Sequence, residues 1–208
     1  MNIISNNCVG AAIYQELNIQ YNNPFMWCFI TGDNFYTLIK EFNNINFNNY
    51  KILDSCLDKE VSEYENTYSL YIDNKIYIHY IHYIHDINFD KPTKKSDITG
   101  KFSRDLLYKN ADILCQNKYV KRLQRMIEEP IFVISLSKYF SFNEIRNCMY
   151  LKSKYNRIFL LPEKFEYDIN KLNENCEVII QPENGVKWST EKAKYILNNS
   201  KILKEKIN

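Results

Sequence analysis

Three short runs of apolar residues in the second half of the chain constrain its fold more than any other feature. They are "IFVISL" (131–136), "RIFLL" (157–161) and "EVIIQ" (177–181). Continuous apolar runs of this length are typical of parallel strands, because helices cover both faces of a parallel sheet. Helical patterns follow the first run (142–152) and the last (190–206). We therefore predict an α/β fold with helix, sheet and helix layers around a mostly parallel (mixed) sheet.

The N-terminal residues show a similar order of elements. An apolar run at 2–5 is followed by Ser5, Asn6 and Asn7, which are helix-capping residue types, and then by apolar residues at helical spacing over 8–18. This order predicts a strand, a turn and a helix. Asp33 is expected to cap a second helix through "NFYTLIKEFNN".

The middle of the chain has a different character. Residues 66–84 are dense in β-branched and aromatic side chains, with Asp73-Asn74 at a turn position, so we predict an inserted β-hairpin. The polar segment at 90–100 is predicted to be a loop, and residues 104–128 are predicted to form a long helix. No domain-scale repeat or linker is present, so we expect one α/β domain over 1–208.

Composition narrows the possible functions. The net charge of +2 over 208 residues gives no general attraction to nucleic acid or to an acidic membrane surface. No segment reaches the roughly 18 apolar residues that a membrane span needs, and the start does not resemble a leader, so we expect a cytoplasmic protein. Six cysteines without a CxxC pair predict reduced thiols. Without a glycine-rich phosphate loop or an HExxH motif, we assign no cofactor and no metal ligand.

Cys8 stands where the predicted strand turns into the predicted helix. Unpaired N–H groups and the positive end of a helix dipole can stabilise a thiolate there, and they can hold an oxyanion during acyl transfer. A buried structural thiol explains the same position, because free cysteines are among the most buried residues. Both interpretations stay open.

A thiol nucleophile usually needs a base, and all three histidines lie within "IHYIHYIHD". On a strand, His79 and His85 point to one face and His82 to the other, which weakens a three-histidine metal site. The alternative is that these are half-buried strand residues satisfied by hydrogen bonds.

A basic stripe lies in "NKYVKRLQRM" (117–126), where Lys118, Lys121, Arg122 and Arg125 recur at helical spacing. Such a stripe can bind phosphate or carboxylate groups. It can equally be the solvated face of a helix.

Three blocks, "ISNNCVGAAIYQELNIQYNNPFMW", "IYIHYIHY" and "KYVKRLQRMIEEPIFVIS", together resemble a bacterial family of unknown function that is associated with exopolysaccharide biosynthesis. The resemblance covers residues 3 to 165. The first motif of that family falls on Ile4, Ser5, Asn6, Asn7 and Cys8, and a later His-Tyr pair falls on His82 and Tyr83. A Trp-x-Arg-Arg-x-x-Arg motif falls on Tyr119, Lys121, Arg122 and Arg125, so that tyrosine and lysine replace the usual tryptophan and first arginine.

The combination of "NNC", "PFMW" and "IHDINF" is also similar to papain-like cysteine peptidases, in which His85-Asp86 would replace His82 as the second catalytic element. The resemblances imply Cys8 as nucleophile with His82 or His85 as base. They also imply substrate contacts for Asn6 and Asn7 beside the helix amides, and for Arg122 and Arg125 on an anionic part of the substrate.

The sequence thus leads to a Cys-His acyl-transfer enzyme (hydrolase, amidase or acyltransferase) that acts on a sugar-derived substrate in exopolysaccharide or capsule biosynthesis. One alternative is a glycosyl or phosphoglycosyl transferase that binds a nucleotide-sugar and uses Cys8 structurally. Another is a non-catalytic binding module of a polysaccharide assembly system. The expected partner is an anionic sugar or a nucleotide-sugar, with no nucleic acid.

Overall fold

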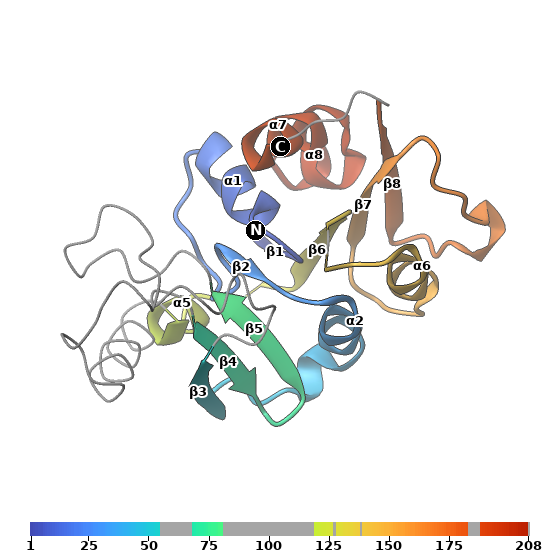
Figure 1. Ribbon diagram of the computed structural model, residues 1–208. Helices are drawn as coiled ribbons and strands as arrows, with labels where there is room; N and C mark the ends of the chain where they lie inside the picture. The colour runs from blue at the N-terminus through green and yellow to red at the C-terminus, as the bar shows by residue number, and fades with distance from the viewer. Residues whose placement is uncertain (55–67, 81–118, 127, 138, 183–187, 208) are drawn as a thin grey trace, which may run out of the picture.

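The computed structural model describes residues 1–54, 68–80, 119–126, 128–137, 139–182 and 188–207. The predicted loop at 90–100, most of the predicted helix at 104–128 and the candidate bases His82 and His85 lie outside these ranges. The described residues form a mixed α/β fold with two four-stranded sheets, one parallel and one antiparallel (Figure 1).

The parallel sheet contains the strands that the apolar runs predicted. Its order is β1 (Asn2–Ser5), β6 (Pro130–Ser135), β7 (Arg157–Pro162) and β8 (Cys176–Gln181). Every residue of β1 and β6 is buried, which explains why these segments lack the apolar–polar alternation of a half-exposed strand.

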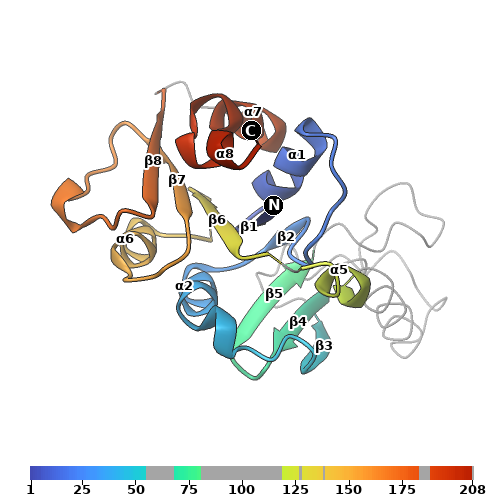
Figure 2. The ribbon, with the colours of Figure 1, turned by 180° about the vertical axis from the view of Figure 1, so that it is seen from behind.

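Helices cover both faces of the parallel sheet (Figures 1 and 2). On one face lie α1 (Val9–Glu16), α7 (Ser189–Asn199) and α8 (Lys201–Ile207); on the other lie α2 (Gly32–Glu41) and α6 (Phe142–Tyr150). Alternate strand residues enter two hydrophobic clusters. The first includes Ile3, Ile13, Ile131, Val133, Ala193 and Ile196, and the second includes Ile4, Leu38, Phe132, Ile134, Ile145 and Met149.

The antiparallel sheet corrects the prediction of one mixed sheet. Its order is β2 (Cys28–Phe29), β5 (Ile76–Tyr80), β4 (Tyr68–Ile72) and β3 (Tyr50–Asp54). The strands β4 and β5 pair across Asp73-Asn74, and both turn residues have φ of 52°, the left-handed conformation that a two-residue turn of this kind requires. The apolar residues of this pair are buried in the second cluster, so they pack on the helices rather than extend the parallel sheet.

Three helix boundaries differ from the sequence prediction. The N-cap of α2 is Thr31, and Asp33 lies within its first turn. Gly32 opens that helix where an added Cβ would lie 2.3 Å from the Glu144 side chain on α6. In the described end of the predicted helix at 104–128, α5 covers only Lys121–Leu123.

The predicted helix at 190–206 is two helices that meet at Ser200. The Glu177 carboxylate of β8 accepts hydrogen bonds from the Ser200 hydroxyl (2.5 Å) and from the N–H groups of Lys201 (2.6 Å) and Ile202 (3.3 Å). These bonds satisfy the first amides of α8, so a new helix begins there. Two more short helices lie in the described part of the chain, η1 (Phe42–Asn44) and η4 (Ile169–Lys171). No helix in the described ranges has the length and apolar character to span a membrane.

Candidate functional site at the carboxyl ends of β1 and β6

The connections that follow β1 and β6 leave the parallel sheet toward opposite faces. Helix α1 packs in the first hydrophobic cluster and α6 in the second, although β1 and β6 are neighbouring strands. In open α/β sheets, ligands bind outside the carboxyl ends of two neighbouring strands whose following connections go to opposite faces of the sheet. The candidate site is therefore formed by the residues just after β1 and β6, which are Asn6, Asn7, Cys8 and Leu136.

Asn6 joins three segments of the chain. Its side-chain amide donates to the Ser135 carbonyl (2.9 Å), and its side-chain oxygen accepts from the Ser135 N–H (3.0 Å). Its own carbonyl accepts from the Ile30 N–H (3.1 Å), just before α2. The side chain is 1 % exposed, so Asn6 holds the site together and faces the end of β6 rather than open space.

Asn7 and Ser5 bind the first turn of α1. The Asn7 side-chain oxygen accepts from the Val9 N–H (3.1 Å), and its amide donates to the Ser135 hydroxyl (2.7 Å). The Ser5 hydroxyl accepts from the Gly10 N–H (2.8 Å) and donates to the Asn7 carbonyl. A Cβ at position 10 would lie 2.6 Å from that hydroxyl, which explains the glycine. Two amides expected to stabilise an oxyanion therefore already have acceptors.

Cys8 occupies the N-cap position of α1 and is 7 % exposed. Burial raises the pKa of its thiol to about 11, and a hydrogen bond from its own backbone N–H opposes this only in part. At neutral pH the thiol is therefore protonated. The helix start predicted a stabilised thiolate, but the loss of solvation is the larger effect in this structure.

Cys28 interacts with Cys8, and Arg122 interacts with Cys28. Cys28 on β2 is fully buried, and the pKa of its thiol is raised well above its usual value, first by burial and then by interaction with Cys8; Arg122 has the opposite influence. The Arg122 guanidinium also lies 5.1 Å from the centre of the Tyr21 ring. Cys28 thus connects Cys8 with Arg122, because it interacts with both.

The other predicted basic residue, Arg125, is half-buried. Its Nε has no hydrogen-bond partner in the part of the chain that the structure describes. Tyr119, which stands at the tryptophan position of the resembled motif, is a core residue. It is 2 % exposed and its hydroxyl donates to the Phe47 carbonyl (2.8 Å).

His79 is the histidine that the structure describes. It lies on β5, is 3 % exposed, and its Nδ1 is 2.7 Å from the Ser69 hydroxyl on β4. Burial lowers the pKa of His79 to about 4, so the ring is neutral at physiological pH. The expectation of a strand histidine satisfied by a hydrogen bond is met at this position.

Sequence reasoning missed Ser135 and Cys28 as members of the site. Ser135 is the polar residue at the end of an otherwise apolar strand, and that contrast was the available signal. Cys28 gave no local signal, because its place beside Cys8 depends on how the antiparallel sheet packs. Among the residues that the structure describes, no three His, Cys, Asp or Glu side chains gather in an arrangement that could hold a metal ion.

Comparison with known proteins adds one finding. A family model described as "Domain of unknown function (DUF1919)" matches residues 1–108, which include β1, α1, Cys8 and the whole antiparallel sheet. A comparison with curated proteins gives no match.

Proposed function

Since the chain belongs to the DUF1919 family, whose description leaves the activity open, we propose its function from the site: a Cys-His acyl-transfer enzyme (hydrolase, amidase or acyltransferase) that acts on a sugar-derived substrate. Cys8 is the nucleophile and His82 or His85 the general base. The observation that carries the proposal is the position of Cys8 at the start of α1, where the connections after the paired strands β1 and β6 leave toward opposite faces of the sheet.

Because the Cys8 thiol is neutral, its deprotonation and its attack on the substrate occur in one step. Because burial holds the pKa of Cys8 at about 11, the sulfur loses its proton to the histidine as it attacks the acyl carbon. The tetrahedral oxyanion takes the place of the Asn7 side-chain oxygen on the Val9 N–H. Collapse forms a thioester and expels the leaving group, which takes the proton from the histidine. Water or an acceptor hydroxyl then releases the acyl group.

Chain length supports the choice of base. Tyr80 ends β5 and pairs with Cys28 on β2, and Cys28 interacts with Cys8. In the sequence, His82 follows Tyr80 by two residues and His85 by five. This short separation along the chain is the reason for choosing these two histidines as candidate bases.

The test is the pH dependence of Cys8 alkylation by iodoacetamide, followed by mass spectrometry of the peptide. The raised thiol pKa values, about 11 for Cys8 and about 12 for Cys148, by themselves give about a tenfold difference in alkylation near pH 7. A Cys-His pair predicts that Cys8 reacts at least about a hundredfold faster than Cys148, and that His82→Ala or His85→Ala returns the ratio to about tenfold. A ratio of about tenfold or less in all three proteins would contradict the thiol mechanism.

Activity on p-nitrophenyl acetate provides the second readout. The wild type should release a burst of nitrophenol as the acyl-enzyme forms, and Cys8→Ser should abolish it. Cys148→Ser is the matched control, because it changes a buried thiol on α6 that lies outside the site, and it should keep the burst.

A second candidate is glycosyl or phosphoglycosyl transfer from a nucleotide-sugar, with Cys8 as a structural residue. It is favoured by the neutral state of the Cys8 thiol and by Arg122, a cation that could face a diphosphate. In that case Cys8→Ser should bind UDP-glucose as the wild type does, and Arg122→Gln should weaken binding about tenfold. Absence of UDP-glucose binding by the wild type would contradict it.

A further inference from the structure

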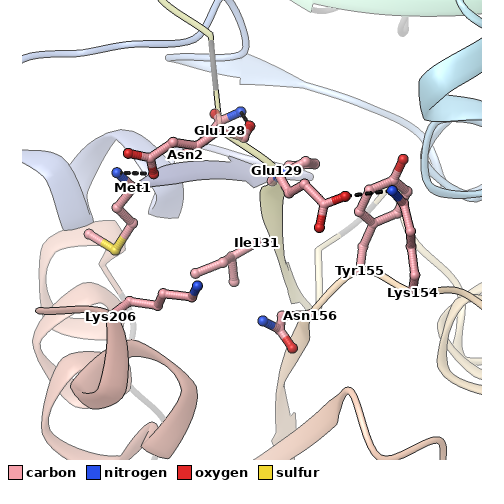
Figure 3. A pocket seen from close by; sticks show the side chains of 10 residues that line it. Met1, Asn2, Glu128, Glu129, Ile131, Lys154, Tyr155, Asn156 and Lys206 are labelled. Carbon is pink, nitrogen blue, oxygen red and sulfur yellow. Dashed lines mark hydrogen bonds and ion pairs between the residues drawn. The ribbon is translucent and has the colours of Figure 1, made fainter.

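A cavity of about 340 Å³ lies at the amino ends of the parallel strands (Figure 3). Cys8 follows the carboxyl end of β1, so the cavity and Cys8 belong to opposite ends of that strand. It is lined by the beginning of β1 and β6, by the residues just before β7, and by the last turn of α8. This volume is at the lower end of the range for small-molecule sites. The cavity therefore has room for a ligand of a few carbon atoms up to the size of a monosaccharide.

The two carboxylates at the cavity are already paired. Glu128 contacts the Met1 amino group, and Glu129 Oε1 lies 2.5 Å from the Lys154 ammonium. The Lys206 ammonium makes no hydrogen bond or ion pair with the residues that the structure describes. One positive charge at the cavity therefore remains uncompensated.

Figure 3 shows where that charge lies. The Lys206 side chain extends from α8 into the cavity, and the Asn156 side chain reaches toward the same space from the opposite wall, below Ile131. The Asn156 backbone carbonyl accepts from the Phe132 N–H, which fixes the residue, while its side-chain amide has no hydrogen-bond partner in the described residues. An ammonium and an amide thus face one space beside the apolar side chain of Ile131.

We propose that this cavity binds a small hydroxy-carboxylate. Its carboxylate lies between Lys206 Nζ and the Asn156 amide, its carbon atoms lie on Ile131, and a hydroxyl donates to the second oxygen of Glu129. A monoanion balances the charge of Lys206, the one cation lining the cavity that has no partner among the described residues. A phosphate dianion carries a second negative charge that the Glu128 and Glu129 carboxylates repel, so carboxylates are preferred over phosphates.

The test is calorimetric titration of the full chain with D-glycerate and D-glucuronate, with glycerol as the neutral probe and inorganic phosphate, at a pH above its second pKa, as the dianion. We expect saturable binding of at least one hydroxy-acid, none of glycerol, and binding of phosphate at least tenfold weaker. Equal affinity for phosphate, or no saturable binding of either acid up to 10 mM, would overturn the proposal.

Variants place the ligand within the cavity. Lys206→Met keeps the apolar stem and should weaken hydroxy-acid binding about tenfold or more, since it removes a charged hydrogen-bond donor. Lys204→Met is the matched control on the same helix turn, because its ammonium donates to the Asn198 carbonyl, away from the cavity. Asn156→Ala should weaken binding by a smaller factor.

Unchanged affinity in Lys206→Met would show that the acid binds elsewhere and that the proposal is wrong. Cys8 chemistry is absent from this test, so its outcome is independent of the proposed enzyme.

Discussion

The two ends of strand β1 differ in how their polar groups are satisfied. At the carboxyl end, the side chains of Asn6 and Asn7 bind Ser135 and the first turn of α1, and all of these residues are buried. At the amino end, a cavity is bordered by the exposed Lys154–Glu129 pair and by the Lys206 ammonium, which has no partner in the described ranges. Polar residues around one sheet therefore serve two purposes. Buried hydrogen-bond networks fix the backbone, whereas exposed charges remain available to bind a ligand.

The largest expected effect on stability is that of Asn6→Ala. It leaves the N–H and the carbonyl of Ser135 buried without partners, and each such group costs about 1–3 kcal/mol, so we expect a loss of about 3 kcal/mol. Urea unfolding measures it. Asn156→Ala at the other end should cost less than about 0.5 kcal/mol. Similar losses for the two variants would remove the contrast between the ends.

Ser135→Ala should have an intermediate effect. It removes the acceptor of the Asn7 amide in a buried setting, at a cost of about 1–2 kcal/mol. Ser137→Ala is the matched control two residues further on, because the Ser137 hydroxyl is buried and lacks a hydrogen-bond partner in the described part of the chain. Its removal should leave the free energy of unfolding unchanged or slightly higher. A loss for Ser137→Ala equal to that for Ser135→Ala would argue against a specific role for the Asn7 bond.

The smallest expected effect on stability is at the amino end of β1. Lys154→Met breaks the ion pair with Glu129, but both side chains are more than half exposed, so the loss should stay below about 0.5 kcal/mol. Thermal unfolding at low and at high salt checks this, because the difference from the wild type should shrink as salt screens the pair. A loss above 1 kcal/mol that persists in high salt would place this pair with the buried networks.

The strands of the parallel sheet could be predicted because burial on both faces leaves a local mark, an apolar run without alternation. The same reasoning failed where partners are distant in the sequence. The break at Ser200 depends on Glu177, 23 residues earlier, and the role of Asn6 depends on Ser135, 129 residues later. The second sheet was missed because local pattern shows that residues 68–80 form strands, but not which sheet they join.

The candidate site was predictable to a similar degree. The position of Cys8 at a helix start follows from the local pattern of Ser5 to Asn7, and the structure has it there. Its raised pKa does not follow from that pattern, because the dipole of a helix is a local property whereas burial is imposed by segments such as β2. The interaction of Arg122 with Cys28 could not be derived from the basic stripe either. Residue spacing predicts which side chains share a helix face, but not which segment packs against that face.

Asn6 also has a consequence for how long the folded molecule can last. Its amide extends the pairing of β1 and β6 beyond the strand, because it offers one donor and one acceptor to the matching groups of Ser135. Hydrolysis of this amide to a carboxylate, a common form of chemical ageing in proteins, would turn the donor into a second acceptor facing the Ser135 carbonyl. The exchange of one nitrogen for an oxygen would then convert this junction of the sheet into a buried repulsion between two acceptors, and the altered molecules would be less stable than the rest of the sample.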